Sequence, residues 1–150
     1  MIVKKIVIDS DIILDHVVSE RSPSLLRKIA REYFCYTTVF NAIELFSAAK
    51  TNKEVCAIED AMSAIKVLGL NYKSAKNIAK LYSVSQQALT GLIAGVCIEA
   101  KLPIVTLMPD RYKRYRLLKV LPAHSVMKMK KYKNELIINN SVLIHKQAEH

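Results

Sequence analysis

Two carboxylates stand where the first apolar run of the chain ends. Asp9 and Asp11 come directly after the apolar residues 6–8. A charge next to an apolar segment is costly to bury unless a cation or hydrogen-bond donors hold it. The pair therefore predicts a cation site. A helix cap is the alternative, because Asp and Ser often begin the helix that follows a strand.

Two further acids follow later strand candidates. Glu44 comes six residues after Thr38, and Asp110 comes shortly after Thr106. Ligands of open α/β sheets bind outside the carboxyl ends of the strands. Carboxylates gathered there form a hard-oxygen site for Mg²⁺ or Mn²⁺, which can activate water and hold a phosphodiester for hydrolysis. The alternatives are a solvated helix residue for Glu44 and a helix cap for Asp110.

The hydrophobic pattern predicts the elements that must position these acids. We expect strands over 4–9, 33–38, 102–107 and 118–121. We expect helices over 11–18 (capped at Ser10 or Asp11), from 22–24 and from 39 onward, and over 53–68 (ended by Gly69), 72–83, 86–100 and 110–117. Strands and helices that alternate without hairpin signals predict an α/β protein, a three-layer α/β/α sandwich around a mostly parallel sheet.

Composition narrows the class of protein. The 150 residues suit one domain, and a hydrophobic share of 51% interrupted by only three glycines and four prolines favours long helices. Cys35, Cys56 and Cys97 stand singly without CxxC spacing, which predicts reduced thiols and a cytoplasmic protein. No stretch approaches the ~20 consecutive apolar residues of a membrane span, so we expect no membrane partner.

The charge is concentrated in the last third of the chain. A net charge of +10 and a basic surface favour a polyanion, most simply nucleic acid. A surface kept basic for solubility, or one that meets an acidic protein, is the alternative. Tyr112 and Tyr115 could stack on bases or pack on the sheet edge. The basic residues are Arg111, Lys113, Arg114, Arg116, Lys119, Lys128, Lys130, Lys131 and Lys133, of which Arg111, Lys113, Arg114 and Arg116 are the candidate nucleic-acid ligands.

Three segments in order, "IVIDSDIILD", "TTVFNAIELFSAA" and "LTGLIAGVCIEAKLPIVTL", resemble the PIN-domain family, and most closely its VapC-like toxins. The resemblance covers residues 3–122. It implies a small α/β/α fold, Mg²⁺- or Mn²⁺-dependent ribonuclease activity, a homodimer and a cognate antitoxin. By this resemblance Asp9 and Glu44 are the first two family acids and the catalytic residues, and Asp11 stands beside the first.

The chain departs from the family at two acids. Thr90 stands at the position of the third acid and Met108 at that of the fourth. Threonine keeps an oxygen without a charge, and methionine cannot serve a hard cation. Asp110 is the candidate replacement. The expected metal ligands are thus Asp9, Asp11, Glu44 and Asp110, with Ser10, Thr38, Thr90 and Thr106 lining the site, and we expect activity to be reduced or absent.

The tail departs from the domain pattern. We expect a PIN-like domain over 1–123 and a basic C-terminal extension of it over 124–150. In "ELIINNSVLI" two apolar runs flank Asn139 and Asn140, which tolerate the positive φ of a hairpin turn. This segment predicts a β-hairpin or an edge strand used in self-association.

Three functions compete. The first is a metal-dependent PIN-type endoribonuclease with a weakened site. The second is a catalytically silent PIN module that binds RNA or an antitoxin-like partner through its basic C-terminal third. The third is a haloacid-dehalogenase-like phosphatase, since "DSD" satisfies the DxD pattern of that class. The later lysine and acidic pair of those phosphatases have no counterpart in the sequence.

Overall fold

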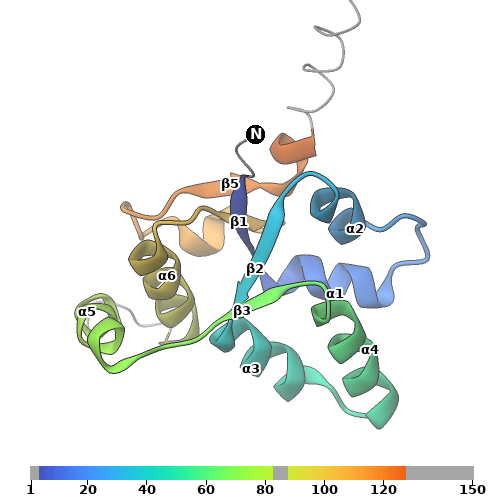
Figure 1. Cartoon of the computed structure of the whole chain (residues 1–150), viewed down its shortest axis with the longest axis horizontal. Coiled ribbons are helices and arrows are strands. Elements are labelled where there is room, and N and C mark those ends of the chain that lie inside the picture. Colours follow the sequence, from blue (N-terminus) through green and yellow to red (C-terminus); the bar gives the residue numbers. More distant parts are fainter. Residues whose placement is uncertain (1–3, 83–87, 128–150) are drawn as a thin grey trace, which may run out of the picture.

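A parallel sheet forms the centre of the molecule (Figure 1). The computed structural model describes residues 4–82 and 88–127. The strand order is β3-β2-β1-β4-β5, and all four pairs of neighbours are parallel. The strands are β1 (Lys5–Ile8), β2 (Phe34–Thr38), β3 (Lys66–Leu68), β4 (Ile104–Thr106) and β5 (Val120–Pro122).

Helices cover both faces of this sheet. In Figure 1, α1, α2 and α4 lie on one side, and α5 and α6 lie on the other. This arrangement confirms the predicted α/β/α sandwich. The helices are α1 (Ser10–Val18), α2 (Leu25–Ala30), α3 (Val39–Ala48), α4 (Asn52–Met62), α5 (Tyr72–Tyr82) and α6 (Ala88–Ala100), with a 3₁₀ helix η1 (Pro109–Tyr112).

The side chains of β1 point alternately to the two faces of the sheet, and a separate core cluster lies on each face. Ile6 and Ile8 pack with residues of α1, α2 and α4, whereas Val7 packs with α6 and η1. Successive side chains of a strand point to opposite faces, and all three are at most 2% exposed. β1 is therefore covered on both faces, as a central parallel strand requires.

The predicted helix over 53–68 is wrong in its second half. α4 ends at Met62, and residues 66–68 form the edge strand β3, which pairs with β2. Ile65 and Leu68 continue the apolar spacing of the helix, while Lys66 and Val67 are exposed. An edge strand with exposed residues has no apolar run that would distinguish it from the end of an amphipathic helix.

Other boundaries differ in smaller ways. The residue that caps α1 is Asp9, where Ser10 or Asp11 was expected. The basic helix predicted over 110–117 is only the 3₁₀ turn of η1, and the last strand begins at Val120. Residues 123–127 are helical, while the hairpin predicted over 135–144 and most of the C-terminal extension lie outside the described residues.

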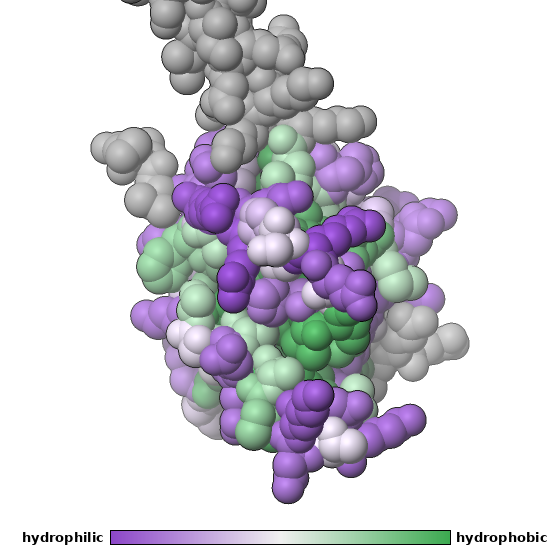
Figure 2. All heavy atoms as spheres, turned by 90° about the vertical axis from the view of Figure 1, so that its right-hand side faces the viewer, coloured by the Kyte–Doolittle hydropathy of each residue, from purple (hydrophilic) through white to green (hydrophobic). Residues whose placement is uncertain are grey.

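None of the helices within the described ranges is long and apolar enough to cross a bilayer. The face over α1, α2 and α4 carries hydrophilic side chains interspersed with smaller apolar areas (Figure 2).

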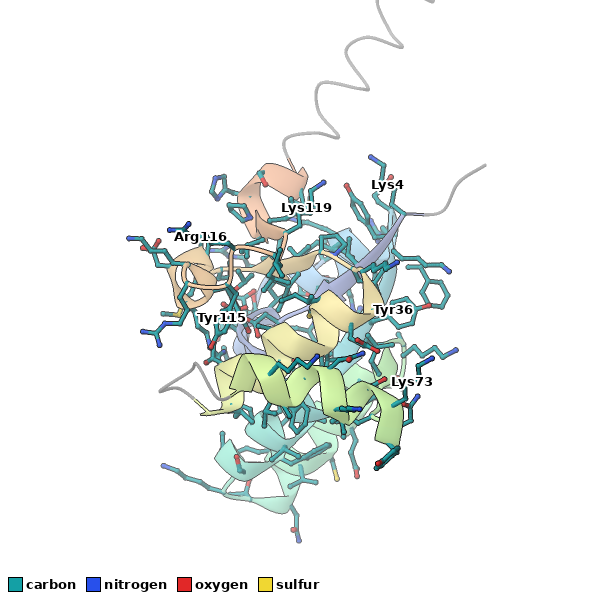
Figure 3. All side chains as sticks on the ribbon, turned by 90° about the vertical axis from the view of Figure 1, so that its left-hand side faces the viewer. Lys4, Tyr36, Lys73, Tyr115, Arg116 and Lys119 are labelled. Carbon is teal, nitrogen blue, oxygen red and sulfur yellow. The ribbon has the colours of Figure 1, made fainter. Side chains whose placement is uncertain are left out.

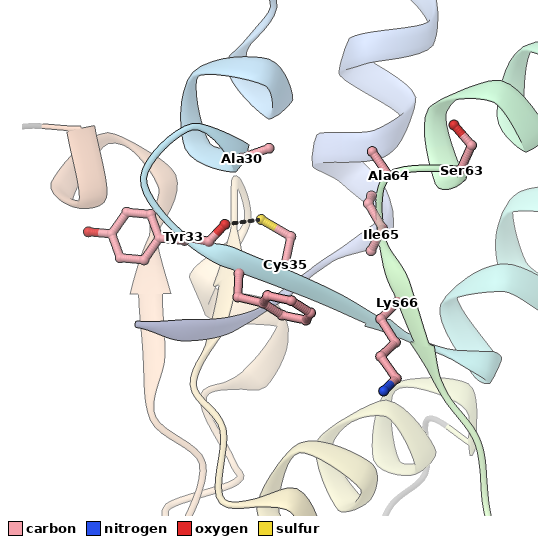
Figure 4. A pocket seen from close by; sticks show the side chains of 8 residues that line it. Ala30, Tyr33, Cys35, Ser63, Ala64, Ile65 and Lys66 are labelled. Atoms are coloured by element: carbon pink, nitrogen blue, oxygen red, sulfur yellow. Dashed lines mark hydrogen bonds between the residues drawn. The ribbon is translucent and has the colours of Figure 1, made fainter. Parts of the chain in front are cut away.

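A hollow of about 440 Å³ lies at the amino ends of β2 and β3 (Figure 4). It is lined by Tyr33, Cys35, Ile65 and Lys66 among others. Burial raises the pKa of the Cys35 thiol to about 11, so the thiol stays protonated and is a poor nucleophile. The hollow faces away from Asp9, which follows the carboxyl end of β1, and carries none of the predicted site residues.

Candidate functional site

The carboxyl ends of three parallel strands bring the predicted site residues to one edge of the sheet. Asp9 follows β1, Thr38 ends β2 and Thr106 ends β4. α1 begins directly after Asp9, and α3 begins directly after Thr38. Helix amino ends carry partial positive charge, so this edge favours anionic side chains.

Asp9 is a fully buried carboxylate. Its Oδ1 accepts hydrogen bonds of 2.9 Å from the Ser10 amide, from Asn41 Nδ2 and from the Tyr112 hydroxyl. Its Oδ2 accepts one of 2.9 Å from Thr106 Oγ1. Burying a carboxylate is costly without such donors; three groups donate to Asp9 Oδ1, and the Thr106 hydroxyl, which also contacts Asp11, is the candidate donor to Oδ2.

Asn41 links the start of α3 to the acid. Its Oδ1 accepts from the amide and hydroxyl of Thr38, and its own amide donates to Thr38 Oγ1, which forms a capping box. Its Nδ2 also donates to Ser10 Oγ at 2.8 Å. Asn41 thus uses one side chain both to begin a helix and to fix Asp9.

Asp11 is held at one oxygen only. Its Oδ2 accepts from Thr106 Oγ1 at 2.8 Å and from the amides of Leu107 and Met108. Its Oδ1 is buried, and no group in the described part of the chain donates to it. Burial, and then the charge of Asp9, raise the pKa of Asp11. The Thr106 hydroxyl has one proton for two carboxylates, so one of them lacks that donor.

Arg111 inserts its guanidinium among the acids. Nη1 and Nη2 donate to Glu44 Oε1 and Oε2 at 3.1 and 2.5 Å, and Nε donates to Thr90 Oγ1 at 3.1 Å. Nη1 also lies 3.7 Å from Asp9 Oδ1. Burial alone would raise the pKa of Glu44, but the hydrogen bonds from Arg111 and Ser10 and the charge of Arg111 lower it. Both partners of this bidentate pair are charged.

Tyr112 supports both Asp9 and Arg111. Its ring is 1% exposed, and its centroid lies 5.6 Å from Arg111 Cζ. Burial and the charge of Asp9 raise the pKa of the Tyr112 hydroxyl. The neutral phenol therefore remains a hydrogen-bond donor to Asp9.

Solved structures share this architecture. A DNA-bound VapBC from Salmonella typhimurium matches with a TM-score of 0.67 and 15% identity, over 81% of this chain and 99% of that chain. VapBC2 from Rickettsia felis, bound to a promoter DNA fragment, matches with 0.66 and 15%, over 79% and 98%. FitAcB from Neisseria gonorrhoeae matches with 0.58 and 12%, over 79% and 97%. The fold is PIN-like.

The likeness is one of fold. The sequence matches no protein-family model and no curated protein. At this level the predicted resemblance to VapC-like PIN domains is confirmed. The chemistry of the PIN-like site must be judged from its own residues.

The PIN-like fold brings most of the predicted site residues together. Asp9, Asp11 and Glu44 meet at one edge, with Ser10, Thr38, Thr90 and Thr106 around them. Asp110 is different: it is an exposed residue of η1, and its carbonyl accepts from the Lys113 amide. Met108 is 62% exposed and reaches the site through its backbone amide.

The basic residues of the segment after β4 do not share one environment. Arg111 faces the acids, whereas Lys113, Arg114 and Arg116 are exposed. In Figure 3, Arg116 and Lys119 lie at the outer surface of the segment that joins η1 to β5. Tyr112 and Tyr115 are 1% and 8% exposed, so the suggestion that they stack on bases is wrong and packing in the core accounts for them.

The residues present do not fit a divalent cation in this arrangement. Both Glu44 oxygens are held by Arg111, and Asp9 Oδ1 accepts three hydrogen bonds from the protein. Among the described residues, no group of three or more His, Cys, Asp or Glu side chains is arranged to hold a metal ion. Mg²⁺ and Mn²⁺ bind through carboxylate oxygens and water, and in this arrangement Asp11 Oδ1 is the one buried carboxylate oxygen of the described site without a donor.

Two residues of the site, Asn41 and Tyr112, were not predicted to belong to it, and a third, Arg111, was predicted elsewhere. Asn41 was detectable, because Thr38 and Asn41 have the spacing of a capping box. Tyr112 gave no signal, since nothing in the sequence shows that its hydroxyl reaches Asp9. Arg111 was assigned to the basic surface, and only the turn of η1 directs it inward.

Proposed function

We propose that this chain is a PIN-fold module that binds RNA and does not cleave it. One observation carries the proposal: the guanidinium of Arg111 holds Glu44 in a bidentate pair and stands 3.7 Å from Asp9. Thr90 and Met108 occupy the positions where the resemblance implies two more acids. In this arrangement Glu44 is therefore not free to bind the metal that PIN-type hydrolysis needs, and two further acids of the resemblance are absent.

The charge supports RNA as the ligand. The chain carries a net charge of +10, and Lys113, Arg114 and Arg116 are exposed next to the site. Because Arg111 is neutralised within the site, these three residues are the proposed phosphate contacts. Contacts of this kind give affinity without sequence specificity and weaken with salt.

Binding of a fluorescent single-stranded RNA at several salt concentrations tests this ligand. The variant Lys113→Ser/Arg114→Ser/Arg116→Ser should bind at least ten-fold more weakly. It should also lower the slope of log affinity against log salt by about 2, since each lost contact on single strands removes about 0.7. The matched control Arg27→Ser/Lys28→Ser/Arg31→Ser removes the same charge from exposed residues near α2. Equal losses in both variants, or no binding by the unaltered chain, would refute the proposed surface.

The competing activity is a Mg²⁺- or Mn²⁺-dependent endoribonuclease that uses Asp9, Asp11 and Glu44, with Asp110 as a fourth ligand. One observation favours it: Asp11 Oδ1 is buried and lacks a donor within the described residues. For this activity Arg111 must leave the site and Asp110 must turn inward. Cleavage that depends on Asp9 would establish the nuclease in place of the binding module.

A protein partner of the antitoxin kind is the second candidate, because the solved structures of this fold include toxin–antitoxin complexes. On this chain it is favoured by apolar side chains that stay exposed on α1 and α3: Leu14, Val18, Ile43 and Phe46. The homodimer remains a further proposal, which sedimentation of the purified chain would test.

Co-expression with the protein encoded beside this chain in its genome tests the protein partner. Ile43→Ser/Phe46→Ser should abolish co-purification. Val67→Ser, at an exposed position of β3, should leave it intact. Co-purification that survives the α3 substitutions would rule out this surface.

A further inference from the structure

The guanidinium of Arg111 makes contacts to three elements at once. It donates hydrogen bonds to Glu44 of α3 and Thr90 of α6, and its Nη1 lies 3.7 Å from Asp9 Oδ1 at the end of β1. Only 22% of its side chain is exposed. A cation held by acceptors from three elements takes the place that an independent cation would need.

The turn of η1 fixes this placement. The Arg111 amide donates to the Met108 carbonyl at 3.1 Å. The next residue, Tyr112, is buried and donates to Asp9. Since the Arg111 amide and the side chain of Tyr112 are both anchored, Arg111 is positioned over the acids by the backbone as well as by its own charge.

A divalent ion would have to compete with this tethered charge. It would need to break two charge-assisted hydrogen bonds to Glu44, which are stronger than neutral ones. The competitor is part of the same chain, and a tethered group acts at an effective concentration in the millimolar range or above. Binding of free Mg²⁺ or Mn²⁺ to these acids is therefore expected to gain little free energy.

We propose that Arg111 is the resident cation of this site and that its guanidinium excludes divalent metal from Asp9, Asp11 and Glu44. The inference deepens the proposed function and rests on its non-cleaving site. It adds that one side chain causes the exclusion, so that removing this side chain opens the acids to a metal ion.

Binding of Mn²⁺ alone tests this exclusion without RNA. Calorimetry gives the affinity, and paramagnetic broadening of the Ser10 and Met108 amide signals shows whether the ion lies at the acids. Arg111→Met removes the charge and keeps much of the length of the side chain. Arg114→Met is the matched control, since it removes an exposed arginine three residues on.

We expect Arg111→Met to bind Mn²⁺ at least ten-fold more tightly than the unaltered chain and Arg114→Met, with broadening at both amides. Adding Asp9→Asn should remove that binding. If Arg111→Met does not fold, Arg111→Gln is the second variant; the glutamine amide can donate to Glu44 but carries no charge, so Mn²⁺ should again bind more tightly than to the unaltered chain.

Two results would overturn the inference. Equal Mn²⁺ affinity and broadening in the unaltered chain and in Arg111→Met would show that Arg111 excludes nothing. Absence of Mn²⁺ binding in every folded variant would show that the acids lack a cation site even when Arg111 is gone. Neither result depends on RNA binding, so failure of this inference is distinct from failure of the RNA-binding proposal.

Discussion

Asp9 is the residue on which the site depends. Removing a carboxylate from water is costly, and Asp9 has no exposed surface. The cost is offset by donors from α1, α3, β4 and η1. Each donor also connects an element to the end of β1. A PIN-type nuclease would use a carboxylate at this position to bind a metal, whereas here Asp9 holds the surrounding elements together.

Tyr112→Phe tests the contribution of one donor. The substitution keeps the ring and removes the hydroxyl that donates to Asp9 at 2.9 Å. Hydrogen bonds to charged groups contribute about 1.5–3 kcal/mol, so the free energy of unfolding in urea should fall by about that amount. Tyr72→Phe, at a position that is 92% exposed, should change it by less than about 0.5 kcal/mol. Equal effects would contradict the assigned role of Tyr112.

Asp11→Asn tests the cost of the second charge. Burial and the charge of Asp9 raise the pKa of Asp11 above 3.8, so ionising it destabilises the folded state relative to the unfolded state. At pH 7 the variant should be more stable than the unaltered chain. Because solvent screens the charge, the gain in the free energy of unfolding should be below about 1 kcal/mol.

The sign of this effect fixes its pH dependence. Below pH 3.8 Asp11 is protonated in both states and the charge costs nothing. As pH rises through the raised folded-state pKa, the unaltered chain loses stability relative to Asp11→Asn. Urea unfolding of both proteins from pH 3 to pH 7 measures the difference. An advantage of Asp11→Asn that stays constant over this range would contradict the assigned charge effect.

Part of the site was predictable at the level of residues. Asp9 and Asp11 were found because acids that follow an apolar strand stand at the carboxyl end of a sheet. Arg111 could not be found in this way, since it is the first of several basic residues, Lys113, Arg114 and Arg116, and its charge does not distinguish it from them. Its direction depends on the 3₁₀ turn of η1 and on Tyr112, and neither leaves a periodic signal.

At the scale of elements, apolar runs predicted the central strands better than the edges. β1, β2 and β4 are covered on both faces and read as apolar or β-branched runs. β3 lies at the edge with two of its three residues exposed, so its sequence resembled the last turn of α4. The error removed one edge strand from the predicted sheet, and because the three-layer arrangement does not depend on that strand, the predicted fold class is unchanged.

Gly95→Ala tests the packing of α5 on α6. A Cβ at Gly95 would lie 2.7 Å from Cγ2 of Ile78, which is 2% exposed. Overpacking costs about 1–3 kcal/mol, and the gain in helix propensity returns about 1 kcal/mol. The net loss in the free energy of unfolding should be up to about 2 kcal/mol by urea titration. Gly69→Ala, with no atom within 4 Å of the added carbon, should be neutral or slightly stabilising, and a loss at both positions would contradict this packing.

At the scale of the whole molecule, the acidic side chains of the site and the basic side chains beside it lie in different environments. The acids lie inward, where Arg111 pairs with Glu44 and lies near Asp9, while Lys113, Arg114 and Arg116 face solvent. The proposed consequence is a basic surface that attracts RNA next to an acidic site closed to metal. Binding is then separated from cleavage within one PIN-like fold.

Cleavage of RNA in Mn²⁺ is the most direct test of this separation. The unaltered chain, Asp9→Asn and Thr90→Asp are incubated with end-labelled mixed RNA, and the products are resolved by length. We predict that the unaltered chain leaves the RNA as intact as Asp9→Asn does. Cleavage by the unaltered chain that is lost in Asp9→Asn would contradict the proposed separation and establish a working metal-dependent nuclease.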